Sequence, residues 1–289
     1  MKNVSTSGIL LGAMLAVTAA IETVSAEPIN STLTTVIEQR SDEDKARDAA
    51  RHPAETLSFF AVEPGMTVVE ALPGGGWYTR ILANYLGSEG TLHGVNYPDE
   101  LWPMFGFATK DWVSDKIAEN KKFPSVVASY TDNGISASGF TFNTVPSNVL
   151  GKVDRVLMIR ALHNLNRFNA QTGVRSQALA ATRAMLKPGG LVGVVQHRAP
   201  ANADPAGVDG SRGYLKQADV MAFFDEAGFE FVASSEINAN PKDKPGPEDI
   251  VWRLPPSLSG SKDEPELRAA MEAIGESDRM TLLFRKPTD

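Results

Sequence analysis

Short apolar segments alternate with segments of helical periodicity through most of the chain. The apolar runs predict strands at positions 67–71, 91–96, 125–129, 153–159, 191–196 and 229–234. Helical periodicity is clearest between them, at 77–86, 170–186 and 215–227. Strands that alternate with helices predict a mostly parallel sheet that is covered on both faces. A last apolar run, 280–284, predicts an antiparallel edge strand.

The first residues have the pattern of a secretory signal peptide. Lys2 precedes an uncharged apolar run at 8–21, and the small residues Val24-Ser25-Ala26 predict cleavage after Ala26. The run is short for a membrane span, and an uncleaved anchor is the alternative. We therefore expect an exported protein, periplasmic or secreted, with no stable membrane insertion after cleavage.

The rest of the chain is interpreted as one domain, 41–289, behind a flexible leader at 27–40. N-terminal helices are expected to begin at Ser41, which can cap an acidic first turn. Two segments interrupt the alternation: 131–152 is rich in Ser, Thr, Asn and Gly, and 238–260 is rich in proline and charge. Both are interpreted as insertions over the sheet.

Charge and cysteine content exclude several classes of function. The formal net charge is −7 and no basic stripe is present, which argues against a nucleic-acid partner. The absence of cysteine excludes disulfides, thiolate zinc sites and cysteine nucleophiles, and it suits an oxidising compartment. No histidine spacing typical of a metal site and no Gly-x-Ser-x-Gly motif occurs, so neither a metal centre nor a serine hydrolase is expected.

Three consecutive glycines, Gly74, Gly75 and Gly76, separate the first predicted strand from the helix that follows it. A bare turn at the carboxyl end of a strand lets a ligand approach the backbone, and the helix N-terminus favours an anionic group. A phosphate-binding loop would need a Gly-Lys-Ser/Thr ending, which is missing. The dinucleotide fingerprint would need Gly or Ala where Thr79 stands.

The segment Glu70-Ala71-Leu72-Pro73-Gly74-Gly75-Gly76 resembles the E-x-G-x-G-x-G motif of class I S-adenosylmethionine-dependent methyltransferases, with Leu72 at the first glycine position. The longer FFAVEPGMTVVEALPGGGWYTRILANYLG resembles a subgroup of exported, predicted methyltransferases that share a PGGGWYT turn. VDRVLMIRALHNL, LKPGGLVGVVQHRAP and DRMTLLFRKP extend the resemblance over nearly the whole mature chain. It implies a doubly wound, mostly parallel, seven-stranded Rossmann-like sheet.

The resemblance also implies S-adenosylmethionine as cofactor and a set of residues around it. Its amino-acid and ribose portion would lie on the turn Gly74, Gly75 and Gly76, with Glu70 organising the loop from below. The family usually has an acid for the ribose hydroxyls where this chain has Asn96, and Asp99 is a candidate substitute.

Four further residues are candidates for the same ligand. Asp132 and Asn133, taken as the end of the third strand, would lie near the adenine. Trp77 and Tyr78 open the helix after the glycines, and aromatic faces can favour a sulfonium cation. The alternative for both rings is packing of the helix start.

Two histidines are candidate general bases. His163 follows the fourth predicted strand and His197 closes the fifth, and the resemblance implies that these strands are neighbours. Both imidazoles would then face the crevice, and an imidazole titrates near neutral pH. The alternative is hydrogen bonding to loop backbone. His52 could cover the same crevice, whereas His93 is expected to be structural.

The resulting hypothesis is an exported S-adenosylmethionine-dependent methyltransferase acting on an unidentified small molecule. The alternative is a non-catalytic protein that binds a nucleoside or another small molecule on the same fold, which Leu72 and Asn96 would suit. An exported enzyme also needs an imported donor, because this cofactor is made in the cytosol. A nicotinamide oxidoreductase is disfavoured by Thr79 and by the absence of an acid at position 96.

Overall fold

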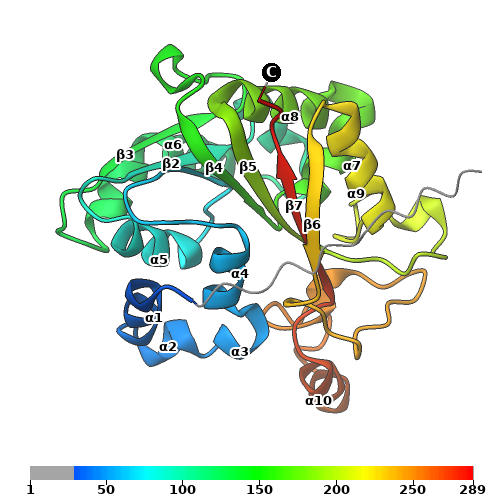
Figure 1. The fold of residues 1–289 in the computed structure, drawn as a ribbon. Coiled ribbons are helices and arrows are strands. Elements are labelled where there is room, and N and C mark those ends of the chain that lie inside the picture. The colour runs from blue at the N-terminus through cyan, green and yellow to red at the C-terminus, as the bar shows by residue number, and fades with distance from the viewer. Residues whose placement is uncertain (1–28, 289) are drawn as a thin grey trace, which may run out of the picture.

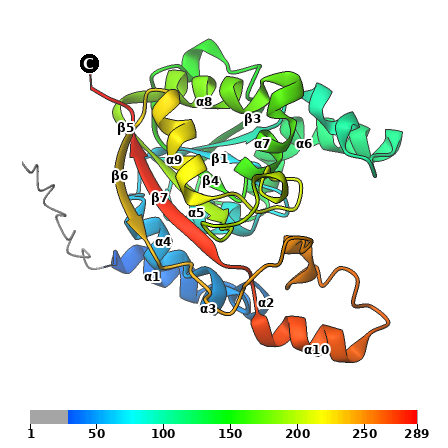
Figure 2. The same ribbon diagram turned by 90° about the vertical axis from the view of Figure 1, so that its right-hand side faces the viewer.

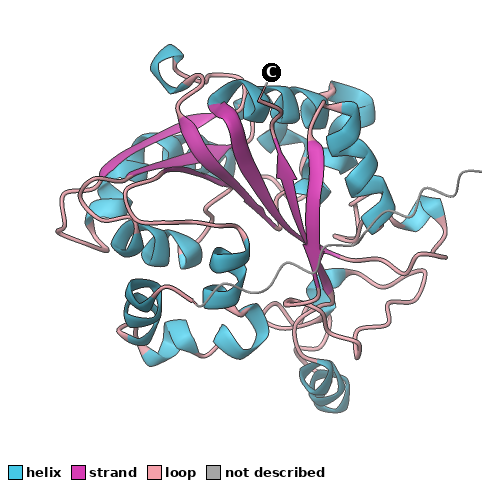
Figure 3. Cartoon of the chain, in the orientation of Figure 1, coloured by secondary structure: helices cyan, strands magenta, loops and turns pink. Residues whose placement is uncertain are grey.

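A computed structural model describes residues 29–288, so the expected signal peptide lies outside the described residues. The core is one seven-stranded sheet with the order β3-β2-β1-β4-β5-β7-β6 (Figures 1 and 3). Its strands are β1 (Thr67–Ala71), β2 (Thr91–Asn96), β3 (Ser136–Thr141), β4 (Val153–Ile159), β5 (Leu186–His197), β6 (Glu230–Ser235) and β7 (Arg279–Arg285). This is the doubly wound, mostly parallel sheet that the sequence predicts.

Strand direction brings the predicted functional segments to one edge. Strands β1, β2, β3, β4 and β5 pair in parallel, so their carboxyl ends lie on the same side of the sheet. The chain leaves β1 toward β2 and β3 and then returns to the other side of β1 with β4. Ligands of such sheets bind at this reversal of strand order.

The final strand is antiparallel, as expected, but it lies one strand inside the edge. β7 pairs with β5 on one side and with β6 on the other. Six of its seven residues are buried, whereas β6 has only exposed and partly buried positions. The apolar β7 therefore takes the interior place and the more polar β6 forms the edge.

The prediction of a strand at 125–129 is wrong, because these residues end the helix α6 (Lys110–Ala128). The third strand is β3, inside the segment interpreted as a polar insertion. β3 packs its backbone closely on α6: a Cβ on Gly139 would come within about 3 Å of the backbone of Asn120. An edge strand in such close contact needs small residues rather than an apolar pattern.

Helices cover both faces of the sheet. One face is packed by α1 (Ser31–Glu38), α4 (Pro53–Phe59), α5 (Trp77–Tyr85) and the end of α6, and the other by α7 (Leu162–Thr172), α8 (Val174–Met185) and α9 (Gln217–Glu226). Short helices α2 (Asp42–Lys45) and α3 (Asp48–Arg51) gather with α10 (Pro265–Ile274) at one end of the sheet (Figure 2). The 3-10 helices are η1 (Asp99–Met104), η2 (Ser147–Val149), η3 (Pro205–Gly207) and η4 (Val251–Arg253).

The leader interpretation is wrong for 31–38, which form α1. Asn30 caps this helix by accepting a hydrogen bond from the Thr32 backbone N–H. Leu33 is fully buried against the core that α4 and α5 share, so α1 belongs to the folded domain. Across residues 29–288, no helix has the length and apolar character that a membrane crossing requires.

Candidate functional site

The turn after β1 has the backbone of a glycine-rich loop although it begins with leucine. Leu72, Gly74 and Gly76 all have positive φ angles, at 55°, 56° and 74°. A left-handed conformation at a non-glycine residue costs about 1–3 kcal/mol and recurs at functional sites. The Leu72 N–H donates to the Val95 carbonyl at 2.7 Å, and its side chain packs on the sheet core. Leu72 thus has a backbone conformation that glycine adopts without strain.

Glu70 links β1 to α5 beneath these glycines. Glu70 is 5% exposed, and its carboxyl group accepts a 2.6 Å hydrogen bond from the hydroxyl of Thr79. Burial raises the pKa of Glu70 to about 7. Thr79 occupies the position where the dinucleotide fingerprint has Gly or Ala, and its hydroxyl donates the hydrogen bond to the buried Glu70.

A cavity of about 390 Å³ opens at this turn. The glycines form one wall, and the residues facing them come from α2, α3 and the end of β4. Its charged and aromatic lining includes Glu43, Asp44, Arg51, Trp77 and Arg160. The volume lies within the range of about 300–1,000 Å³ that is usual for small-molecule sites.

Four arginines surround a single carboxylate behind this cavity. Glu276 pairs with Arg47 at 2.5 Å, with Arg279 at 2.9 Å and with Arg51 at 3.4 Å. Arg160 interacts with Glu276 only at longer range, and its guanidinium makes no ion pair or hydrogen bond within residues 29–288. Burial and the charge of Arg160 lower the pKa of Arg51 to about 9. Burial acts to raise the pKa of Glu276, but the arginines outweigh it and hold that pKa below its usual range.

Sequence reasoning missed this cluster. Arg160 directly follows β4, so the rule that ligands meet strand ends could have found it. The residue has a φ of 60°, and its N–H donates to the Val195 carbonyl at 2.6 Å. Glu276 lies 225 residues from Arg51 in the chain, and no local pattern predicts that pair.

At the end of β2, Asn96 turns away from the crevice. Its amide donates a 2.9 Å hydrogen bond to Asn120 in α6, and its side chain is buried there. Asp99, at the start of η1, has a buried Oδ1 that finds no hydrogen-bond partner in the described part of the chain. Asn96 and Asp99 are both candidates to bind a ribose, and of the two only Asp99 has a carboxylate oxygen without a hydrogen-bond partner in the described residues.

Asp132 and Asn133 are not brought to the carboxyl edge. They precede β3, and the Asn133 amide donates to the Ala83 carbonyl near the end of α5, away from the glycine turn. Their predicted place near an adenine is wrong because it rests on the misplaced third strand. The residue that ends β3 is Thr141.

The two aromatic residues that open α5 are held by other groups. The Trp77 indole N–H donates to the Asp44 carbonyl at 3.0 Å, and the guanidinium groups of Arg51 and Arg40 lie 4.5 and 5.1 Å from its ring. Tyr78 is buried in the core with α4 and α5, and burial raises its pKa. Both residues border the cavity, but Tyr78 is packed into the core as the alternative expects, and Trp77 already has cations over its ring.

His163 and His197 lie together, as the sequence predicts. Their ring centroids are 5.7 Å apart, at the ends of the paired strands β4 and β5. Burial lowers the pKa of His163 to about 4, and burial with the neighbouring His163 holds the pKa of His197 well below its usual value. Both imidazoles are therefore neutral at neutral pH. Neither ring lines the glycine-turn cavity.

The other two histidines lie outside this pair. His52 stands between α3 and α4 with a φ of 42°, next to the cavity residue Arg51. His93 contacts the Ser138 hydroxyl at 2.8 Å between β2 and β3, which is the structural role expected for it.

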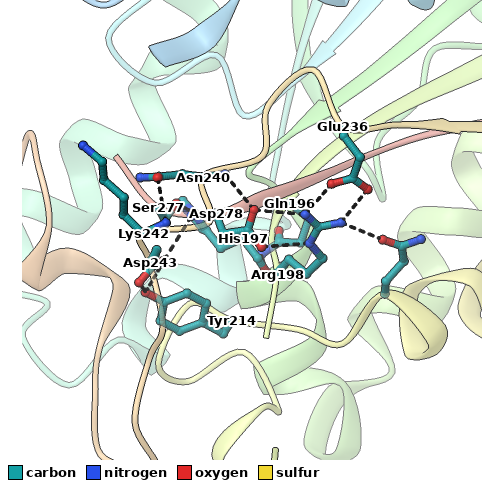
Figure 4. A network of polar contacts seen from close by, with 11 residues as sticks. Gln196, His197, Arg198, Tyr214, Glu236, Asn240, Lys242, Asp243, Ser277 and Asp278 are labelled. Atoms are coloured by element: carbon teal, nitrogen blue, oxygen red, sulfur yellow. Dashed lines mark hydrogen bonds and ion pairs between the residues drawn. The ribbon is translucent and has the colours of Figure 1, made fainter. Parts of the chain in front are cut away.

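A polar network extends from His197 (Figure 4). Nδ1 of His197 lies 2.6 Å from the Ser277 hydroxyl. Arg198 binds Asp278 and Glu236 at 2.9 and 2.6 Å, and the Asp278 N–H donates to Asp243. Asp243 also accepts from the Tyr214 hydroxyl at 3.0 Å. These contacts fasten the proline-rich segment 238–260 to the carboxyl edge of the sheet.

Several buried polar atoms along this edge have no hydrogen-bond partner among the described residues. They include Oδ1 of Asp99 and Nε1 of Trp102, which follow β2. Buried polar atoms are almost always paired in folded proteins. This free acceptor and this free donor after β2 are therefore suited to a polar ligand.

Metal binding has no comparable support in the described part of the chain. Residues 29–288 contain no group of three or more His, Cys, Asp or Glu side chains placed to hold a metal ion.

No protein-family model matches the sequence, and no curated protein matches it. Solved structures similar to this chain include S-adenosylmethionine-dependent methyltransferases. One, from Aquifex aeolicus, is 15% identical with a TM-score of 0.45 and covers 71% of this chain and 93% of its own. A Burkholderia thailandensis 1,6-didemethyltoxoflavin-N1-methyltransferase with bound S-adenosylhomocysteine is 12% identical, has a TM-score of 0.45 and covers 88% and 85%.

An arsenic(III) S-adenosylmethionine methyltransferase from Chlamydomonas reinhardtii is also similar, at 12% identity, a TM-score of 0.45 and coverage of 90% and 74%. These identities and TM-scores leave the function of this chain to be argued from its own site.

Proposed function

We propose that this protein is an S-adenosylmethionine-dependent methyltransferase that acts on a small molecule. The proposal depends chiefly on one observation, the 390 Å³ cavity where the strand order reverses between β1 and β4. Its walls carry both signs of charge, which suits a ligand that has both ammonium and carboxylate groups. The free polar atoms after β2 extend the same edge toward a nucleoside.

The residues present can hold each part of this cofactor. Glu43 and Asp44 at the cavity wall can accept hydrogen bonds from its ammonium group. The N–H groups that open α5 suit its carboxylate, since a helix N-terminus favours negative charge. Asp99 and Trp102, with an acceptor and a donor free, suit the ribose and the base.

When bound, the cofactor supplies an electrophilic methyl carbon, which the acceptor attacks while the carbon–sulfur bond breaks and sulfur keeps the electron pair. The chain then has to orient the acceptor and accept any proton that it loses. His163 and His197 are neutral at neutral pH and so are in the form that can accept a proton. Their lowered pKa values make them weak bases, which suits an acceptor that is already deprotonated or has no proton to lose.

Export is part of the proposal and is supported by the signal-like segment that ends at Ala26. Fractionation of cells that express the chain, with N-terminal sequencing, tests it: a mature start at Glu27 outside the cytosol is the expected result. A full-length cytosolic chain would contradict export without affecting the cofactor site.

A non-catalytic binding protein is the second candidate, because Asn96 bonds to Asn120 instead of facing the crevice. Calorimetric titration with S-adenosylhomocysteine and then with NAD tests the first proposal. We expect S-adenosylhomocysteine to bind and NAD not to bind. At one hundred times its dissociation constant the former should add about 2.7 kcal/mol to the free energy of unfolding.

The matched variants are Gly75→Leu and Gly106→Leu. A Cβ at either glycine meets no atom within 4 Å and neither has a positive φ, but only Gly75 lines the cavity. Gly75→Leu should therefore abolish binding while both variants keep their stability within about 0.5 kcal/mol. Equal affinity in the two variants would place the ligand elsewhere. Binding without methyl transfer to any acceptor would favour the second candidate.

A further inference from the structure

The arginine cluster behind the cavity has an excess of positive charge. Arg47, Arg51 and Arg279 surround Glu276, and Arg160 interacts with it at longer range, so four positive charges lie around one negative charge. Arg51 and Arg279 are each 3% exposed, and solvent cannot screen them well. Of the carboxylates nearby, Asp48 pairs with Arg40 and Asp44 with Arg80, whereas Glu43 lines the cavity without an ion pair among residues 29–288. Buried charge of this kind is normally paired.

The excess positive charge of the arginine cluster lies at the cavity wall. Arg47, Arg51 and Arg160 all line it, and Arg160 is the member without an ion pair in the described chain. The turn that presents Arg160 is built into the sheet, because its N–H bonds to Val195 in β5. A backbone φ of 60° at a non-glycine residue costs free energy and recurs at functional sites.

The proposed cofactor does not neutralise the cluster. S-adenosylmethionine has a sulfonium and an ammonium against one carboxylate, so binding it adds positive charge beside four arginines. A second negative group in the same cavity would offset the charge of Arg51 and Arg160, which Glu43 and Asp44 on the α2 side do not pair with. We propose that the methyl acceptor is a small oxyanion-bearing molecule, a carboxylate or phosphate compound, whose acidic group binds Arg51 and Arg160. This inference rests on the proposed function.

The arrangement favours an acid over a neutral acceptor for a further reason. Guanidinium groups bind carboxylates and phosphates through two parallel hydrogen bonds, which fixes orientation as well as affinity. Arginines fixed at the edge of the sheet would hold an acceptor beside the glycine turn in one orientation and so position its reacting atom. Orientation of this kind is the main contribution that a protein makes to methyl transfer.

The test uses the whole protein with malonate and inorganic phosphate as probe anions, followed by calorimetry and thermal unfolding. Sodium chloride at the same ionic strength is the control for general salt effects. We expect both probes to bind and to raise the unfolding temperature above that in chloride. Arg160→Gln should weaken malonate binding at least tenfold. The control Arg212→Gln, which removes an arginine with one surface ion pair to Glu248, should leave it unchanged.

Three outcomes would overturn the inference. Malonate and phosphate could act no differently from chloride, or Arg160→Gln could bind them as well as the unchanged protein does. Malonate could also compete with S-adenosylhomocysteine, which would assign the arginines to the carboxylate of the cofactor and leave the proposed function standing. Simultaneous binding of malonate and S-adenosylhomocysteine is the expected result.

Failure of the proposed function would look different. In that case S-adenosylhomocysteine would not bind, while malonate would still bind in an Arg160-dependent way, and the acid would be a ligand rather than a methyl acceptor. If Arg160→Gln does not fold, Arg160→Lys is the second variant. It keeps the charge but loses the paired hydrogen bonds, and should bind malonate more weakly than the unchanged protein.

Discussion

The hydroxyl of Thr79 lies 2.6 Å from a carboxylate oxygen of Glu70, and this contact joins the first turn of α5 to β1 below the glycine turn. The carboxyl group is almost fully buried, and Thr79 is its only hydrogen-bonding side chain within residues 29–288. Burial outweighs that hydrogen bond and raises the pKa of Glu70 to about 7. The base of the proposed site therefore changes charge near neutral pH.

Glu70→Gln should change how stability depends on pH. The pKa of Glu70 is 4.5 as a free group and about 7 in the fold, so the folded state holds the proton more tightly. The stability from this proton is present below pH 4.5 and is lost as pH rises through 7. Glutamine keeps an acceptor for Thr79 and does not titrate. The free energy of unfolding of the variant, minus that of the unchanged protein, should therefore be about 3 kcal/mol larger at pH 8 than at pH 4.5.

Urea unfolding at pH 4.5, 6 and 8 measures this difference. Thr79→Val is the companion variant, because loss of the hydroxyl leaves the buried carboxylate unpaired. It should destabilise the fold by about 1–3 kcal/mol, with the larger loss at pH 8. Parallel stability curves for Glu70→Gln and the unchanged protein would show that Glu70 does not titrate in this range.

Gly76→Ala should destabilise the fold more than Gly75→Ala. A Cβ at Gly76 would lie 2.7 Å from the Tyr130 hydroxyl, and the residue has a φ of 74°. Gly75 has open space and an ordinary φ. We expect a loss of about 1–3 kcal/mol at Gly76 and less than about 0.5 kcal/mol at Gly75, measured by thermal unfolding. Equal losses would contradict the left-handed conformation at Gly76.

The sequence contains enough information for the parts of the site that lie at strand ends. Glu70, the glycine turn, His163 and His197 all follow apolar strands, and parallel strands bring their carboxyl ends together. The sequence does not predict the position of β3, because the apolar residues at the end of α6 resemble a strand and β3 itself needs glycine for close packing. Asp132 and Asn133 therefore precede the third strand, at its amino end, and do not follow it as predicted.

The arginine cluster could not be predicted in the same way. Arg47 and Arg51 lie on a short N-terminal segment, and their partner Glu276 comes just before the last strand. Residues so distant in the chain meet only because β7 is inserted between β5 and β6, which starts it beside the carboxyl ends of the parallel strands. Neither segment has a periodicity or motif that predicts this contact.

His163→Gln should make the fold less sensitive to acid. The pKa of His163 is 6.5 as a free group and about 4 in the fold, because burial disfavours the imidazolium. The stability from the neutral ring is present above pH 6.5 and is lost as pH falls through 4. Glutamine has no such proton to take up. Between pH 6.5 and 4 the unchanged protein should lose about 3 kcal/mol more than the variant in urea unfolding.

Equal acid sensitivity in the two proteins would mean that His163 is accessible to solvent. His197→Gln is informative beside it, because the two rings lie 5.7 Å apart and His163 helps to lower the pKa of His197. If the two histidines titrate as a coupled pair, the single variants should not be additive. The double variant should then reduce the acid sensitivity of stability by less than the sum of the two single reductions.

Glu276→Gln should be the most damaging single change among these predictions. Removing this carboxylate leaves Arg47, Arg51 and Arg279 without their shared partner, and breaking a buried ion pair costs about 3–5 kcal/mol. Glu272→Gln is the control, since Glu272 forms one exposed pair with Arg268 in α10 and should change stability by less than about 0.5 kcal/mol. Urea unfolding of both variants gives the comparison.

The same variant connects stability to the proposed anion site. Glu276 is the carboxylate that opposes an incoming acid at the arginine cluster, so its removal should raise the affinity for malonate even as it destabilises the fold. Added malonate should then restore more stability to Glu276→Gln than to Glu272→Gln, because an anion that binds only the folded state shifts the unfolding equilibrium. Equal recovery in both would show that the excess charge at Arg51 and Arg160 is not what binds the anion.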